Sequence, residues 1–254
     1  MLLDNPNGNY KFVRGYGAPF SSGALAHPGF EIVHASFRPL AALADGYGLI
    51  ESHMRAAGRP LGAICGIELR IPAALTAAGF DEFNRPYIER LTAWGLMVEG
   101  LNPVARTNVA PASSPIAGPS IYGFYYTVPA AAAGAARPSF VLAGVPEVAS
   151  REGGKREVVA AGDVSLEGLR RKTTCIMEAL GGLLREMNIG WDEASAVNLY
   201  TVHDVHPLFA TDLLPALGAA TYRGIRWHYA RPPVIGLELE IDGYAARQEL
   251  VLAP

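Results

Sequence analysis

The sequence predicts an α+β fold built from two tandem modules, at residues 1–130 and 138–254. Three observations predict it. The order strand, helix, strand, helix, Ala-Arg, strand occurs once in each half of the chain. The Ala-Arg pair recurs in NPVARTNVA (102–110) and YARPPVIG (229–236), and an Ala/Gly/Pro-rich stretch lies between the halves. We therefore expect each module to be a mostly antiparallel sheet with two helices packed on one face.

The first module supplies each element in that order. FEIVHASF is strand-like, PLAALADGYGLIESHMRAAG is helical, GAICGIELRI alternates apolar and polar residues, FDEFNRPYIERLTAWG is helical, and SIYGFYYTVP is a strand (30–37, 39–58, 62–71, 80–95 and 120–129). Proline removes a backbone donor, so Pro86 is expected in the first turn of its helix.

The second module repeats the order. SFVLAGVPEV (139–148) is an apolar strand, followed by a polar hairpin-like turn, ASREGGKREVV. Leu169, Ile176 and Leu180 then recur at helical spacing, after Asp163 or Ser165 as the cap. EASAVNLYTV is a strand, HPLFATDLLPAL is a second helix that Pro215 kinks or shortens, and LELEID alternates strictly (193–202, 206–217 and 237–242).

Composition limits the class of protein. Half of the residues are hydrophobic, 18% are charged and the net charge is −3, which indicates a globular chain with no basic surface for nucleic acid. Cys65 and Cys175 lie among apolar residues and are expected to be buried thiols. The N-terminus has no signal-peptide pattern, and no apolar run is long enough to cross a membrane. We expect a cytoplasmic protein.

The second half resembles the Rid (YjgF-like) family of reactive-intermediate imine deaminases. The resemblance rests on LAGVPEV, GDVSLEGL, AVNLYTVHDV, ARPPV and LELEIDGYA in that order, with the first half as a diverged copy. It implies a chorismate-mutase-like fold for both modules, a trimeric ring with ligand clefts between modules, and neither metal nor cofactor. Chorismatases and ring-opening hydrolases resemble the chain in architecture only.

The resemblance implies that Arg106 and Arg231 bind a substrate carboxylate. A guanidinium presents a planar fork that matches a carboxylate with two charge-assisted hydrogen bonds. The alternative is an arginine paired with a surface acid. Pro232 and Pro233 replace the residues of the family motif after Arg231, which weakens its case.

The resemblance also places a catalytic glutamate on the last strand, at Glu240, where it would orient a water for attack on a C=N bond. The alternative is that Glu238, Glu240 and Asp242 form one solvated face of a sheet. The first module has no acid between Arg106 and its last strand. We therefore expect one cleft in which one module supplies Arg106 and the other supplies Glu240.

Other motifs carry less chemistry. Tyr122 lies on an aromatic stripe that is typical of a core or interface, with substrate stacking as the second interpretation. His203, Asp204 and His206 lack a further ligand at metal-site spacing. PASSPIAGPS has no lysine spaced to activate a serine, and REGGKRE is not a phosphate loop.

The sequence thus predicts a cofactor-free hydrolase that deaminates a small imine or enamine carboxylate, with the breakdown of a nitrogen-containing compound as the expected setting. Two alternatives stay open. One is a metabolite-binding protein that keeps the fold without catalysis. The other is a hydrolase of the chorismatase or ring-opening kind on the same architecture.

Overall fold

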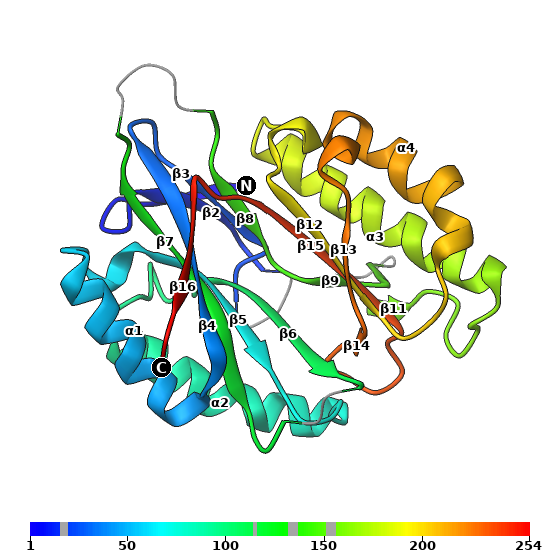
Figure 1. Ribbon diagram of the computed structural model, residues 1–254, viewed down its shortest axis with the longest axis horizontal. Helices are drawn as coiled ribbons and strands as arrows, with labels where there is room; N and C mark the ends of the chain where they lie inside the picture. Colours follow the sequence, from blue (N-terminus) through cyan, green and yellow to red (C-terminus); the bar gives the residue numbers. More distant parts are fainter. Residues whose placement is uncertain (16–19, 114–115, 132–136, 151–155) are drawn as a thin grey trace.

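The computed structural model describes residues 1–15, 20–113, 116–131, 137–150 and 156–254 (Figure 1). Two sheets lie at the centre, with α1 (Leu43–Ala56) and α2 (Ala77–Ala93) on one side and α3 (Leu166–Glu186) and α4 (Leu214–Leu217) on the opposite side. None of the helices in these ranges is long and apolar enough to cross a membrane.

The larger sheet takes strands from both ends of the chain. Its order is β1 (Leu2–Asn5), β2 (Tyr10–Val13), β3 (Gly23–Ala26), β8 (Phe140–Leu142), β15 (Leu239–Ala245), β12 (Ala196–Thr201) and β13 (Arg226–His228), with β9 (Val145–Pro146) also paired to β15. β12 and β13 are parallel and the other pairs are antiparallel. The N-terminal strands therefore complete the sheet of the C-terminal half.

The six-stranded sheet shows the reverse exchange. Its order is β14 (Ala230–Arg231), β6 (Ala105–Pro111), β5 (Ile64–Arg70), β7 (Ser120–Pro129), β4 (Phe30–Ala42) and β16 (Gln248–Leu252). The β5–β6 and β4–β16 pairs are parallel. Because each sheet uses strands from both halves of the chain, the prediction of two tandem chorismate-mutase-like modules is wrong, although most strand pairs are antiparallel as expected.

Most elements follow the local signals in the sequence. The Ser165 side chain accepts from the Gly168 amide at the start of α3, and the apolar face of this helix is buried, including Ile176 and Leu180. Thr76 caps α2 in the same way. Pro86 lies in the interior of α2 rather than in its first turn.

The second helix of the C-terminal half is broken into short pieces. A 3-10 turn (His206–Leu208), a π turn (Phe209–Leu213) and α4 replace the continuous helix expected over 206–217. Further 3-10 turns lie at Leu61–Ala63, Trp191–Glu193 and Gly218–Arg223. Pro215 is the second residue of α4, and a proline in the first turn loses no helical hydrogen bond.

Each helical layer has its own core, and a third core joins the two sheets along their boundary, which we call the seam. The third core includes Tyr10 and Phe12 of β2, Tyr125 of β7, Val141 of β8 and Tyr244 of β15. Strands β10 (Val148–Ser150) and β11 (Arg156–Val158) pair as a hairpin beside this seam, and the predicted turn between them lies outside the described residues. This seam positions the site.

Candidate active site

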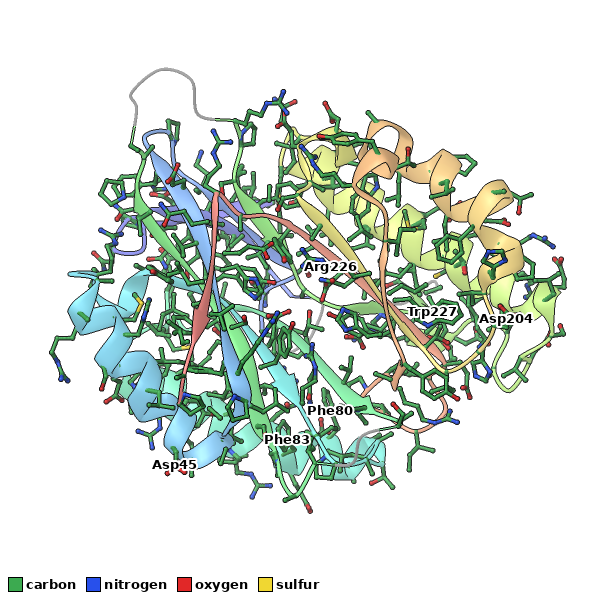
Figure 2. The ribbon with its side chains drawn as sticks, in the orientation of Figure 1. Asp45, Phe80, Phe83, Asp204, Arg226 and Trp227 are labelled. Carbon is green, nitrogen blue, oxygen red and sulfur yellow. The ribbon has the colours of Figure 1, made fainter. Side chains whose placement is uncertain are left out.

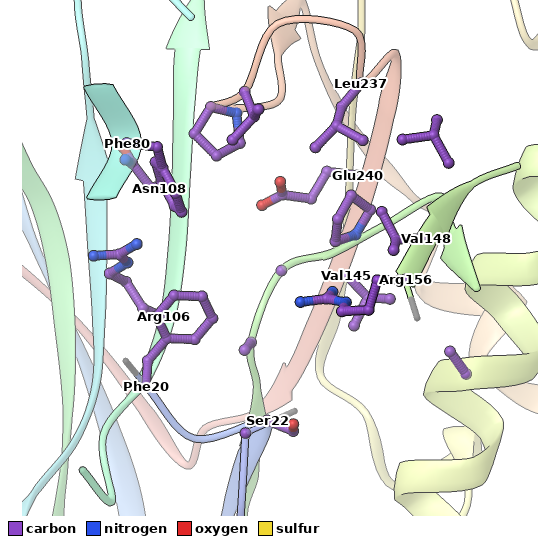
Figure 3. A pocket seen from close by; sticks show the side chains of 18 of the residues that line it. Phe20, Ser22, Phe80, Arg106, Asn108, Val145, Val148, Arg156, Leu237 and Glu240 are labelled. Carbon is purple, nitrogen blue, oxygen red and sulfur yellow. The ribbon is translucent and has the colours of Figure 1, made fainter. Parts of the chain in front are cut away.

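A cavity of about 830 Å³ lies between the two sheets. One wall comes from β6 and α2, and the other from β9, the β10–β11 hairpin and α3. Figure 3 shows Arg106 and Asn108 on the first wall and Val145, Val148 and Arg156 on the second. The volume suits a small organic ligand.

Arg106 is 3% exposed, and its guanidinium is held by aromatic rings. The ring centroids of Phe20, Tyr87 and Phe80 lie 4.5, 4.8 and 5.2 Å from its Cζ atom. Within the described part of the chain, neither terminal nitrogen has a hydrogen-bond partner. Burial lowers the pKa of Arg106, which nearby Tyr87 and Glu240 oppose. A buried cation with free donors is an anion-binding group.

Two amides flank this guanidinium. Asn108 follows Arg106 by two residues on β6, so their side chains leave the same face of the sheet. Asn84 lies one turn after Phe80 on α2, which faces β6. Asn84 and Asn108 are 5% and 3% exposed, and Asn84 Oδ1 and both polar atoms of Asn108 have no partner among the described residues.

Glu240 enters the cavity from β15. Figure 3 shows its carboxyl group directed toward the Arg106 wall. Burial raises the pKa of Glu240 well above its ordinary value; Asp242 and Glu147 add to the rise and Arg106 opposes it. The side chain is 3% exposed, so the solvated-face alternative fails for this residue. A raised pKa favours the protonated form of the carboxyl group, which can act as an acid.

Gly144 leaves the space that the Glu240 carboxyl group occupies. A Cβ atom at Gly144 would lie 2.0 Å from Glu240 Oε1. The Gly144 amide also donates to the Arg106 carbonyl, with an N–O distance of 3.2 Å. The same short segment therefore touches the backbone of one proposed site residue and the side chain of the other.

A buried ion pair fixes the start of β15. Lys172 Nζ lies 3.3 Å from Glu147 Oε1, and both side chains are 0% exposed. Glu147 accepts from the amides of Glu238 and Leu239 at 2.7 and 3.2 Å. These amides directly precede Glu240, so the pair between α3 and Glu147 sets the direction of the strand at the site.

Asp242 lies behind the cavity and is fully engaged. It accepts from Thr107 Oγ1 at 2.6 Å, Asn198 Nδ2 at 2.7 Å and Tyr200 Oη at 3.0 Å. Burial and the nearby Glu68 raise the pKa of Asp242 to about 6, although these three donors oppose the rise. Asp242 is thus buried rather than solvated, and it links β15 to β6 and β12.

The structure brings Arg106 and Glu240 together but leaves the other predicted substrate-binding residues outside the cavity lining. The Arg231 side chain is 50% exposed and pairs with Glu238 at 3.4 Å. Tyr122 is half-buried beneath Arg70, whose Cζ atom lies 4.2 Å from the ring centroid. Substrate binding by Arg231 and Tyr122 stays a prediction.

The histidine segment lies elsewhere. Figure 2 places Asp204 at the edge of the molecule beside α3, far from Phe80 in the cavity wall. His203 pairs with Glu238 at 2.6 Å. Within the described ranges, no three His, Cys, Asp or Glu side chains are grouped so that they could hold a metal ion. Of the two cysteines, Cys65 is buried and Cys175 is half-buried in the cavity wall.

Sequence reasoning missed four residues of the cavity: Asn84, Asn108, Gly144 and Arg156. A signal existed for two of them, because Asn108 shares a strand face with Arg106 and Asn84 shares a helix face with Phe80 and Tyr87. Gly144 and Arg156 reach the cavity only through the pairing of β9 with β15 and of β10 with β11.

Comparison with known proteins gives the family. The model of the family described as 2-aminomuconate deaminase CnbZ matches residues 2–250, so the chain belongs to that family. The chain is also 40% identical over 248 residues to a 2-amino-5-chloromuconate deaminase from Comamonas testosteroni, covering 96% of each protein. The prediction of a deaminase is confirmed at this level.

A chorismatase crystal structure aligns with 89% of this chain and 77% of its own, at 13% identity and a TM-score of 0.48. A similarity this low supports no conclusion about fold or activity. The assignment to the Rid family is wrong, since the CnbZ family model covers almost the whole chain. The Rid resemblance depended on motifs of a few residues each, in an element order that other α+β proteins share. The trimeric ring rested on the same resemblance and stays a prediction.

Proposed function

We propose that this chain is a hydrolytic deaminase of a 2-aminomuconate-type substrate, a conjugated dicarboxylate with an amino group beside one carboxylate. The products are the 2-oxo acid and ammonia. The observation that carries the proposal is the pairing, in one cavity, of a buried guanidinium with free donors and a buried carboxyl group of raised pKa. The family model and the Comamonas relative support the substrate class.

Arg106 binds the carboxylate next to the amino group. Its two free terminal nitrogens match a carboxylate, and the aromatic rings around it fix the plane of the fork. Binding neutralises a charge that is buried without a partner in the free protein, so the ligand gains more than it would from an exposed arginine.

Glu240 moves the protons. The neutral carboxyl group protonates the enamine carbon, which gives an iminium ion and a carboxylate. The carboxylate then takes a proton from water as the water oxygen bonds to the iminium carbon. The resulting carboxyl group protonates the nitrogen, the C–N bond breaks, and ammonia leaves as the hydroxyl proton returns to Glu240. One group of raised pKa serves as acid and base in turn.

Arg156 provides a cation for the far carboxylate. It lines the opposite wall, on β11, with its side chain extended toward the cavity in Figure 3. A substrate held by Arg106 at one end and Arg156 at the other places its amino-bearing carbon beside Glu240. This arrangement favours a dicarboxylate over a monocarboxylate.

The test is ammonia release from 2-aminomuconate generated in situ. We expect turnover by the wild type and a fall in kcat/KM of about 10²- to 10⁴-fold for Arg106→Ala, from the loss of two charge-assisted hydrogen bonds. Arg55→Ala, at an exposed arginine in the last turn of α1, is the matched control and should keep the wild-type rate.

Arg231→Ala in the same assay tests which of the two predicted arginines, Arg106 or Arg231, binds the substrate carboxylate. An unchanged rate in Arg106→Ala rejects the carboxylate-binding role. A wild-type protein that binds muconate but releases no ammonia rejects the deaminase proposal and supports a metabolite-binding protein.

A further inference from the structure

Three buried polar atoms beside Arg106 are not explained by carboxylate binding to the guanidinium. They are Asn84 Oδ1, Asn108 Oδ1 and Asn108 Nδ2, none of which has a partner within the described ranges. Leaving such an atom buried and unpaired costs about 1–3 kcal/mol. Both residues line the cavity. Unpaired polar atoms in a cavity wall are suited to pair with the polar groups of a ligand.

We infer that Asn84 and Asn108 receive the amino group of the substrate, an inference that rests on the proposed function. An enamine nitrogen carries two N–H donors and needs two acceptors. Arg106 offers only donors, and the neutral Glu240 carboxyl group is needed for the carbon. The two amide oxygens lie on the wall that holds the adjacent carboxylate, so amine and carboxylate are recognised side by side.

The same contacts strengthen as the reaction proceeds. Protonation of the enamine carbon moves positive charge onto the nitrogen, and its hydrogen bonds to amide oxygens become charge-assisted. An interaction that is stronger in the transition state raises kcat as well as affinity. The two asparagines therefore stabilise the iminium ion that water attacks.

The inference also sets the sign of a stability change. Replacing an unpartnered buried amide with an apolar side chain of similar size removes a desolvation penalty. Asn84→Leu and Asn108→Leu should therefore unfold at the same temperature as the wild type or a higher one. A protein that is at least as stable yet less active separates a binding role from a structural one.

The experiment compares 2-aminomuconate as substrate with muconate, which lacks only the amino group, as competitive inhibitor. For each leucine variant we expect kcat/KM to fall about 10- to 100-fold, from the loss of one charge-assisted hydrogen bond, while the Ki of muconate changes less than about threefold. Asn84→Gln keeps a neutral amide oxygen and should recover part of the rate lost in Asn84→Leu.

Two results overturn the inference while leaving the deaminase proposal intact. One is an unchanged kcat/KM in both leucine variants. The other is a Ki for muconate that rises as much as kcat/KM falls, which would assign the asparagines to a carboxylate. If the wild type releases no ammonia, thermal shifts with 2-aminomuconate and with muconate still test the asparagines. The leucine variants should then show the wild-type thermal shift with muconate and a smaller shift than the wild type with 2-aminomuconate.

Discussion

Gly144→Ala tests whether the position of the Glu240 carboxyl group sets the rate. The new Cβ atom would lie 2.0 Å from Glu240 Oε1, 2.8 Å from its Cδ and 3.2 Å from its Cγ. The φ angle of Gly144 is not positive, so alanine adds no backbone strain. The conflict falls on the end of a flexible side chain, which can move without disturbing the fold.

The size of the effect follows from these distances. Ordinary contact begins at 3.4 Å, so the nearest oxygen must move by about 1.4 Å. Misplacing a reacting group by about 1 Å costs on the order of 10²-fold in rate. We expect Gly144→Ala to lower kcat about 100-fold, with little change in the Ki of muconate and in the unfolding midpoint.

A double-mutant cycle isolates the contact. Glu240→Asp shortens the side chain by one methylene group and alone should lower kcat because the carboxyl group no longer reaches the substrate. When residue 144 is alanine, the shorter Asp side chain at 240 relieves the clash. The loss of activation free energy in the double variant should therefore be smaller than the sum of the losses in the two single variants. Ammonia release and urea unfolding are measured for all four proteins. A wild-type rate in Gly144→Ala, or additive losses in the cycle, would refute the role of the Glu240 position.

Three further predictions follow from the same geometry. Lys172→Met leaves the Glu147 carboxylate buried without its cation and should lower the free energy of unfolding by about 3–5 kcal/mol in urea, with part of the loss recovered by adding Glu147→Gln. Folding raises the pKa of Asp242 from 3.8 to about 6, so the stabilisation from its protonated form is complete below about pH 4 and is lost as the pH rises through 6. Asp242→Asn should therefore remove up to about 3 kcal/mol from the change in the free energy of unfolding over this pH range. Arg156→Met should weaken inhibition by muconate about tenfold but leave inhibition by sorbate, its monocarboxylate analogue, unchanged, and equal losses for both inhibitors would contradict the assignment.

Local structure could be predicted from local signals. The period of apolar residues and the Ser165 cap place α3, and alternation in GAICGIELRI and SIYGFYYTVP places β5 and β7. The assembly of the sheets could not be predicted, because the exchange of end strands between sheets depends on contacts over long sequence separations. β3 pairs with β8, and β16 pairs with β4.

The candidate site was predicted in part for a related reason. Arg106 and Glu240 were singled out because the Rid resemblance aligned them with a carboxylate-binding arginine and a catalytic glutamate, although the chain belongs to another family. Both line the cavity, as a cleft shared between the halves requires. The spacing of Asn84 and Asn108 could place them on the faces that hold Phe80 and Arg106, but the sequence does not show whether a buried amide finds a partner in the fold. Arg231 shows the converse, because its sequence context matches Arg106 while its side chain meets Glu238 at the surface.

The exchange of strands has a consequence for the chemistry. Arg106 and Asn108 belong to β6 of one sheet, while Glu240 belongs to β15 of the other. The Gly144 amide, just before β9, bonds to the Arg106 carbonyl of β6, and β9 in turn pairs with β15. The Thr107–Asp242 hydrogen bond joins β6 to β15 directly, behind the cavity. The distance between the Arg106 wall and the Glu240 carboxyl group is therefore set by the seam between the sheets rather than by either sheet alone. Substitutions at this seam that leave both sheets folded should reduce turnover before they reduce stability, because catalysis is sensitive to shifts that packing tolerates.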